Sequence, residues 1–130
     1  MSERDEKQAK LLNIQIFVLF FSILSIILSI LTTYNQKLAT EKKNVLFEPE
    51  KARDITLFNR ILITSIAIIF LYINYRQYKI DKNYNDNNSV KNDQLQIIAS
   101  LFTIASALIA LYVVYKSTTE TVADVENPVI

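Results

Sequence analysis

The sequence lacks cysteine, histidine and glycine, and each absence excludes a class of site. Without cysteine there is no disulfide framework, iron–sulfur cluster or thiolate chemistry. Without histidine the chain has lost the commonest metal ligand and general base. Without glycine there is no glycine-rich phosphate loop, no dinucleotide fingerprint and no glycine-based helix-dimer motif. We therefore expect a non-enzymatic protein with no catalytic, cofactor or metal site.

Charge is also absent from the middle of three apolar runs, at residues 11–36, 61–75 and 95–115. A bilayer core is about 30 Å thick, so a spanning helix needs about 20 mostly apolar residues. The first and third runs reach that length, and the second reaches it if Arg60 and Arg76 snorkel to the two interfaces. A soluble bundle would show a polar face every third or fourth residue. The predicted fold class is therefore all-α, an integral membrane protein with three transmembrane helices in an up-down-up bundle.

The predicted organisation is a single three-helix domain with spans at about residues 11–36, 57–78 and 94–116. Loops at 37–56 and 79–93 join the spans, and an extended acidic tail follows at 118–130. Ser2 is the expected N-cap of the first helix, Pro49 opens the second, and Ser89 or Asn92 caps the third. Three crossings place the two termini on opposite sides of the membrane. The 14 lysines and arginines divide evenly between the sides, so the positive-inside rule gives no orientation.

Small and weakly polar side chains recur at helical spacing along the spans. Such stripes favour helix packing, because small residues let backbones approach and hydroxyl groups bond across helices. The alternative is a water-filled pore lined by the same hydroxyls, which three helices can enclose only in an oligomer. The predicted helix-packing stripe consists of Ser22, Ser25 and Ser29 in the first span and Ala99, Thr103, Ser106 and Ala110 in the third.

Arg60 is the one charged residue that can lie within the membrane. We favour a snorkelling interfacial anchor, and the alternative is contact with an anion or a lipid phosphate. Every aspartate and glutamate lies outside the spans. A proton relay needs carboxylates or histidines inside the membrane, so proton-coupled transport is not expected.

Apolar residues outside the spans point to protein partners. Exposed apolar residues in short extramembrane segments can act as docking points, and the up-down-up topology puts the first loop and the tail on one side. We expect contacts with the lipid bilayer and, through this loop and tail, with other subunits of a large assembly. Net charge is near zero with no basic block, so no nucleic acid and no small-molecule substrate are expected. The candidate partner contacts are Val45, Leu46 and Phe47 in the loop and Val122, Val125, Val129 and Ile130 in the tail.

A resemblance to a known group of proteins covers most of the chain and rests on the composition and the order of its apolar runs. These runs are LLNIQIFVLFFSILSIILSILTTYNQ, NVLFEPEKARDITLFNRILITSIAIIFLYINY and LQIIASLFTIASALIALYVVY. The chain resembles small three-span membrane proteins encoded by nucleocytoplasmic large DNA viruses. This resemblance implies a protein of the internal virion membrane, a minor capsid component that ties membrane to shell, and it carries over no site residues. The expected function is a membrane-anchored scaffold subunit. The alternatives are a small holin-like oligomeric pore and an accessory subunit of an energy-converting membrane complex.

Overall fold

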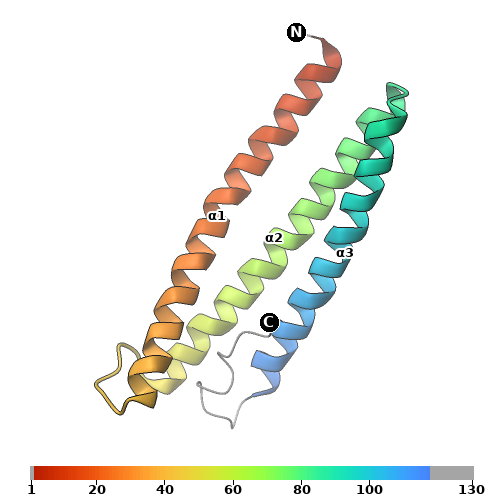
Figure 1. Ribbon diagram of the computed structural model, residues 1–130. Helices are drawn as coiled ribbons and strands as arrows, with labels where there is room; N and C mark the ends of the chain where they lie inside the picture. Colours follow the sequence, from red (N-terminus) through yellow and green to blue (C-terminus); the bar gives the residue numbers. More distant parts are fainter. Residues whose placement is uncertain (1, 118–130) are drawn as a thin grey trace.

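A computed structural model of the chain describes residues 2–117. This part of the chain forms three helices, α1 (Glu3–Thr40), α2 (Pro49–Asn83) and α3 (Asn87–Lys116). Each helix runs antiparallel to the next, and α2 lies between α1 and α3 (Figure 1). All three are long and apolar enough to cross a membrane. The all-α membrane fold predicted from the three uncharged runs is confirmed.

The ends of the helices follow from short local signals. The Ser2 hydroxyl oxygen accepts the N–H of Asp5 at 3.1 Å and caps α1, and Pro49 is the first residue of α2. The predicted cap of α3 is wrong: the cap is Asp86, whose carboxylate accepts the N–H of Ser89 at 3.2 Å. Aspartate, asparagine and serine are nearly equal as N-caps, so composition alone does not choose among them in this stretch.

Two turns need a left-handed backbone in a chain that has no glycine. Lys42, after α1, has φ of 58°, and Asn85, between α2 and α3, has φ of 56°. Asparagine is enriched in this region, whereas a lysine there costs roughly 1–2 kcal/mol. The turn at Lys42 is held by two hydrogen bonds to the last turn of α1, from its own N–H to Ala39 and from the next N–H to Leu38.

The helices pack through positions seven residues apart. A spacing of seven keeps one stripe of a helix against its neighbour when the pair crosses as a left-handed coil. On α2, buried residues face both neighbours, which agrees with its central position. The stripes are Leu11, Val18, Ser25 and Thr32 on α1, and Ser100, Ala107 and Val114 on α3.

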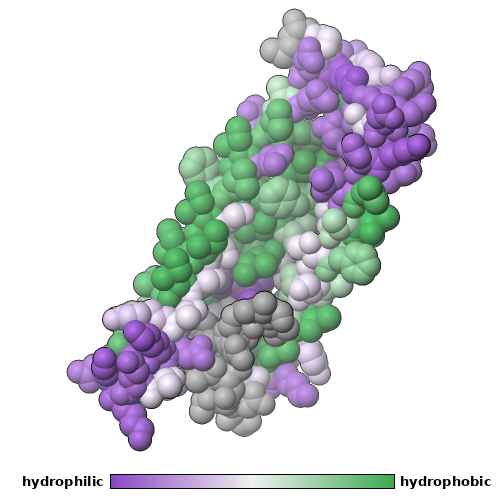
Figure 2. Space-filling view, in the orientation of Figure 1, coloured by the Kyte–Doolittle hydropathy of each residue, from purple (hydrophilic) through white to green (hydrophobic). Residues whose placement is uncertain are grey.

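The remaining surface of the helices is mostly apolar and exposed. Figure 2 shows a wide hydrophobic band between two hydrophilic ends. Tyrosines mark the edges of this band, with lysines over their rings: Lys79 over Tyr75 at one end and Lys116 over Tyr112 at the other, at 5.6 Å and 6.0 Å from the ring centroids. Such aromatic belts sit at the headgroup level, so the band is the part of the protein that contacts the bilayer.

Candidate functional site

The first polar contact inside the band joins α1 to α2. The Ser25 hydroxyl donates to Asn59 Oδ1 at 2.7 Å, and Asn59 Nδ2 donates to the Ser29 hydroxyl at 2.8 Å. Asn59 is only 4% exposed, so both ends of its amide are satisfied away from lipid. The third predicted serine of this stripe, Ser22, is half-buried and donates to the carbonyl of Val18 on its own helix.

A second polar contact joins α2 to α3, where Asn74 Nδ2 donates to the Ser100 hydroxyl at 2.6 Å. The packing face of α3 is therefore displaced by one position, or about 100°, from the predicted stripe. The prediction is wrong for three of its four residues on this helix, because small residues occupy two adjacent faces and only one of them meets α2. Ala99, Thr103 and Ser106 are exposed and Ala110 is half-buried.

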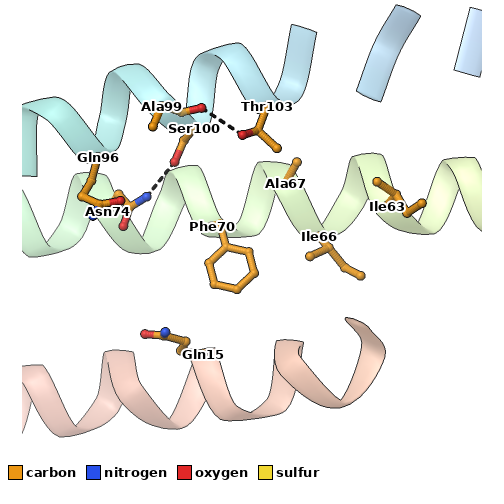
Figure 3. Close-up of a pocket in the computed structure, with 10 residues that line it drawn as sticks. All are labelled: Gln15, Ile63, Ile66, Ala67, Phe70, Asn74, Gln96, Ala99, Ser100 and Thr103. Atoms are coloured by element: carbon orange, nitrogen blue, oxygen red, sulfur yellow. Dashed lines mark hydrogen bonds between the residues drawn. The ribbon is translucent and has the colours of Figure 1, made fainter. Parts of the chain in front are cut away.

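Ser100, on the face of α3 that meets α2, borders a cavity of about 590 Å³ among the three helices (Figure 3). Gln15 on α1 lies across from Phe70 on α2, while Gln96 on α3 lies beside Asn74. Ala99 and Thr103 line the α3 side, and the Thr103 hydroxyl donates back to the Ala99 carbonyl. The cavity thus has amide groups at one end, and its other walls are aliphatic side chains with the ring of Phe70 and the hydroxyls of Ser100 and Thr103.

The chemistry of this cavity is restricted to hydrogen bonding. Its lining holds no acid, base or nucleophile of raised reactivity, since the polar groups are amides and hydroxyls. Among residues 2–117 there is no cluster of histidine, cysteine, aspartate and glutamate that could hold a metal ion. The cavity can accept water or a polar headgroup through these amides and hydroxyls.

A charged cluster ties the three helices together at the end that holds Ser2 and the α2–α3 turn. Arg4 Nη2 on α1 donates to Asp81 Oδ1 on α2 at 2.8 Å and to Asp86 Oδ2 in the turn at 3.0 Å. Its guanidinium also lies over the ring of Tyr84, 5.5 Å from the centroid. Asp81 is 3% exposed, so this carboxylate is buried although it lies outside the spans.

Asp93 of α3 completes this cluster with an unusual protonation state. Burial, followed by the neighbouring Asp81 carboxylate, raises the pKa of Asp93 to about 7. Burial also opposes ionisation of Asp81, but hydrogen bonds from Asp93, Arg4 and Gln77 outweigh it and hold the pKa of Asp81 below its ordinary value. The Arg4 hydrogen bond, with help from Ser89, likewise lowers the pKa of Asp86. Between about pH 4 and pH 7, Asp93 therefore holds a proton beside the ionised carboxylate of Asp81.

Sequence reasoning missed this cluster because each of its members is unremarkable alone. Acidic residues outside a membrane are usually solvated, and nothing in the spacing of Arg4, Asp81 and Asp93 marks them as partners. A signal was nevertheless present: the up-down-up topology brings the start of the first helix and both sides of the second loop to one end. An arginine and three aspartates at one end are candidates for pairing.

The first loop lies at the other end of the molecule and has a defined shape. The N–H of Phe47 donates to Asn35 Oδ1 at 2.8 Å, and Asn35 is buried at the end of α1. Lys51 lies over the Phe47 ring, 5.9 Å from its centroid. Of the three predicted contact residues, Phe47 is half-buried, while Val45 and Leu46 are 39% and 52% exposed.

The tail is the other predicted contact segment, and Val122, Val125, Val129 and Ile130 lie outside the described residues. The last described residue, Ser117, lies at the end of the molecule that carries the first loop. Its carbonyl oxygen accepts a hydrogen bond from Arg53 Nε on α2 at 3.3 Å. Ser117, at the end of α3, therefore lies beside the first turns of α2.

Comparisons with protein-family models, with curated proteins and with solved structures find no match to this chain.

Proposed function

We propose that the chain is a non-enzymatic scaffold subunit, fixed in a membrane by three helices and joined to a larger assembly through its first loop. The observation that carries the proposal is the pair Val45 and Leu46, two exposed aliphatic side chains in an extramembrane loop. The hydrogen bond that the Phe47 N–H donates to Asn35 Oδ1 anchors that loop to α1. An apolar surface that is already ordered loses little conformational entropy when it binds a partner.

The polar groups in the membrane support this assignment. Ser25 and Ser29, two of the hydroxyls that a pore would need, are engaged with Asn59 between helices. They contribute to holding α1 on α2, and this use favours a structural role over an aqueous channel.

The resemblance to membrane proteins of large DNA viruses suggests which membrane and which partner the proposal concerns. In this extended form the membrane is the internal membrane of a virion, and the partner of the first loop is a capsid protein. The three helices would then act as the membrane half of a bracket, with the loop and the tail on the side that faces the shell.

The test introduces charge into the loop. The double substitution V45D/L46D should lower incorporation of the protein into its native assembly at least tenfold, because burying an aliphatic side chain contributes about 1.5–3 kcal/mol and 1.4 kcal/mol corresponds to a factor of ten. Incorporation is measured by quantitative mass spectrometry of purified assemblies against membrane-inserted protein. The matched control is Asn44→Asp, which adds charge to the same loop without removing an apolar side chain.

A second measurement identifies the partner. A photo-crosslinking residue at Leu46 should form links to one abundant protein of the assembly, and deletion of residues 120–130 should lower incorporation while leaving membrane insertion intact. Undiminished incorporation of V45D/L46D, or links only between copies of this chain, would overturn the scaffold proposal.

A further inference from the structure

Arg60 lies inside the apolar part of α2 and is the only charged residue between Asp54 and Arg76. At 1.5 Å per residue, Arg60 is about 24 Å along the helix from Arg76 and about 9 Å from Asp54. A hydrocarbon core about 30 Å thick that begins at Arg76 therefore ends about 6 Å beyond Arg60. The guanidinium belongs to the outer part of one leaflet, within reach of that interface.

The charge of Arg60 is not neutralised by the described part of the chain. Its Nε is buried and has no hydrogen-bond partner there. None of the ion pairs formed by residues 2–117 includes Arg60. A partly buried cation without an anion is unfavourable in a medium of low dielectric constant, so this position calls for a negatively charged group from outside the described residues.

Arg60 also lines a groove of about 470 Å³ between α2 and α3. Small residues of α3 make the groove, and Thr103 and Ser106 add hydroxyls to it. Phe102 and Ile109, two of its apolar residues, are exposed. No residue of α1 is part of its wall, so the groove lies on the outer surface of the α2–α3 pair within the lipid-facing band.

We propose that this groove binds an anionic phospholipid, with its phosphate on Arg60 and an acyl chain along Ile63, Phe102 and Ile109. The planar guanidinium can donate two parallel hydrogen bonds to phosphate oxygens. Helix side chains lean toward the N-terminus of their helix, which for Arg60 is the direction of the nearer interface, where lipid phosphates lie. The apolar walls supply the contact that an acyl chain needs.

The other source of negative charge is the acidic tail, residues 118–130. A tail segment in this groove would bring its backbone amide groups into hydrocarbon, and each unsatisfied group costs several kcal/mol there. The phosphate of a lipid neutralises the Arg60 guanidinium without that cost, so a lipid is the favoured occupant.

The experiment uses the full chain, purified in mild detergent after incubation with vesicles of phosphatidylcholine and phosphatidylglycerol in a 4:1 ratio. Native mass spectrometry counts the lipids that remain bound. Wild-type protein should retain phosphatidylglycerol at least tenfold above its share in the mixture. Arg60→Gln should lower this retention at least tenfold, Arg60→Lys about threefold, and the control Arg76→Gln less than twofold.

Three outcomes would overturn the proposal. They are equal retention of the two lipids by the wild type, unchanged retention in Arg60→Gln, and a tenfold gain of phosphatidylglycerol on deletion of residues 120–130. The last result would assign the groove to the tail. Because the lipid comparison is made on the wild type, the proposal stays testable even if Arg60→Gln does not fold.

Discussion

Because Asp93 holds a proton in the folded chain, we expect the protein to become less stable as the pH rises. The folded chain holds the Asp93 proton to a pKa of about 7, whereas the ordinary pKa is 3.8. Since the folded state binds this proton more tightly than the unfolded state, its contribution to the free energy of unfolding is complete below about pH 4. It is lost as the pH rises to about 7. One pH unit corresponds to about 1.4 kcal/mol, but Asp93 is partly exposed, and solvent screening reduces the loss over this interval to about 1–2 kcal/mol.

The other carboxyl groups of the cluster change stability in a different interval. The pKa values of Asp81 and Asp86 are lowered, so their contributions are present above the ordinary pKa and are lost only as the pH falls below about 4. Arg4 keeps its charge throughout. Between pH 4.5 and 7.5, Asp93 is therefore the group of this cluster that changes protonation.

The assay measures unfolding in mixed micelles with increasing dodecyl sulfate at pH values from 4.5 to 8.5. Because the chain has no cysteine, spin labels at the exposed positions Glu6 and Asn88 can also report the distance between α1 and α3. We expect a narrow distance distribution at pH 5.5 and a broader one at pH 8.5. Asp93→Asn keeps a hydrogen-bond donor for Asp81 and should abolish both effects, while Asp54→Asn, at an exposed site, should abolish neither. A wild type that is equally stable at pH 5 and pH 8, or an unaltered pH slope in Asp93→Asn, would refute the reasoning.

Four further predictions concern stability in the same micelles. Asn59→Ala removes two bonds between helices and should lower the free energy of unfolding by about 1–2 kcal/mol, since such bonds average about 0.6 kcal/mol each and reach about 1.7; no loss would mean that the bonds do not hold α1 on α2. A double-mutant cycle on Asn74 and Ser100 should give a coupling energy of about 0.6 kcal/mol, and strict additivity would contradict the contact. Lys42→Gly should raise stability by about 1 kcal/mol, because glycine has no cost at positive φ, and an unchanged midpoint would argue against strain in that turn. Asn35→Ala should speed amide hydrogen exchange in the first loop with little effect on the spans, because it removes the loop's bond to α1; unchanged exchange would show that the loop is ordered by other contacts.

The spans and most helix ends were predictable because their causes are local. Residue 49 is a proline that opens α2, and Ser2 caps α1, as the sequence indicated. The packing face of α3 was not predictable to better than one position. Small residues lie on both sides of the true face, and hydropathy does not distinguish a face that meets a helix from one that meets lipid.

Of the candidate sites, the first loop was predictable from the sequence and the charged cluster around Asp81 was not. That Val45 and Leu46 are exposed follows from their place in a short polar loop, and the structure adds the bond to Asn35 that anchors the loop. The burial of Asp81 could not be read from the sequence, because it depends on residues 77 positions away in the chain.

The sequence by itself determined that this protein crosses a membrane with three helices. The length of each uncharged apolar run can be counted in the sequence and compared with the thickness of a bilayer. It also excluded metal and redox sites that need histidine or cysteine. Only the tertiary structure decided the rotation of each helix about its axis. That rotation brings Asn59 onto α1, leaves Arg60 in a groove facing lipid, and places Asp93 against Asp81. These pairings depend on how three helices pack at once, and the pattern of a single helix does not specify them.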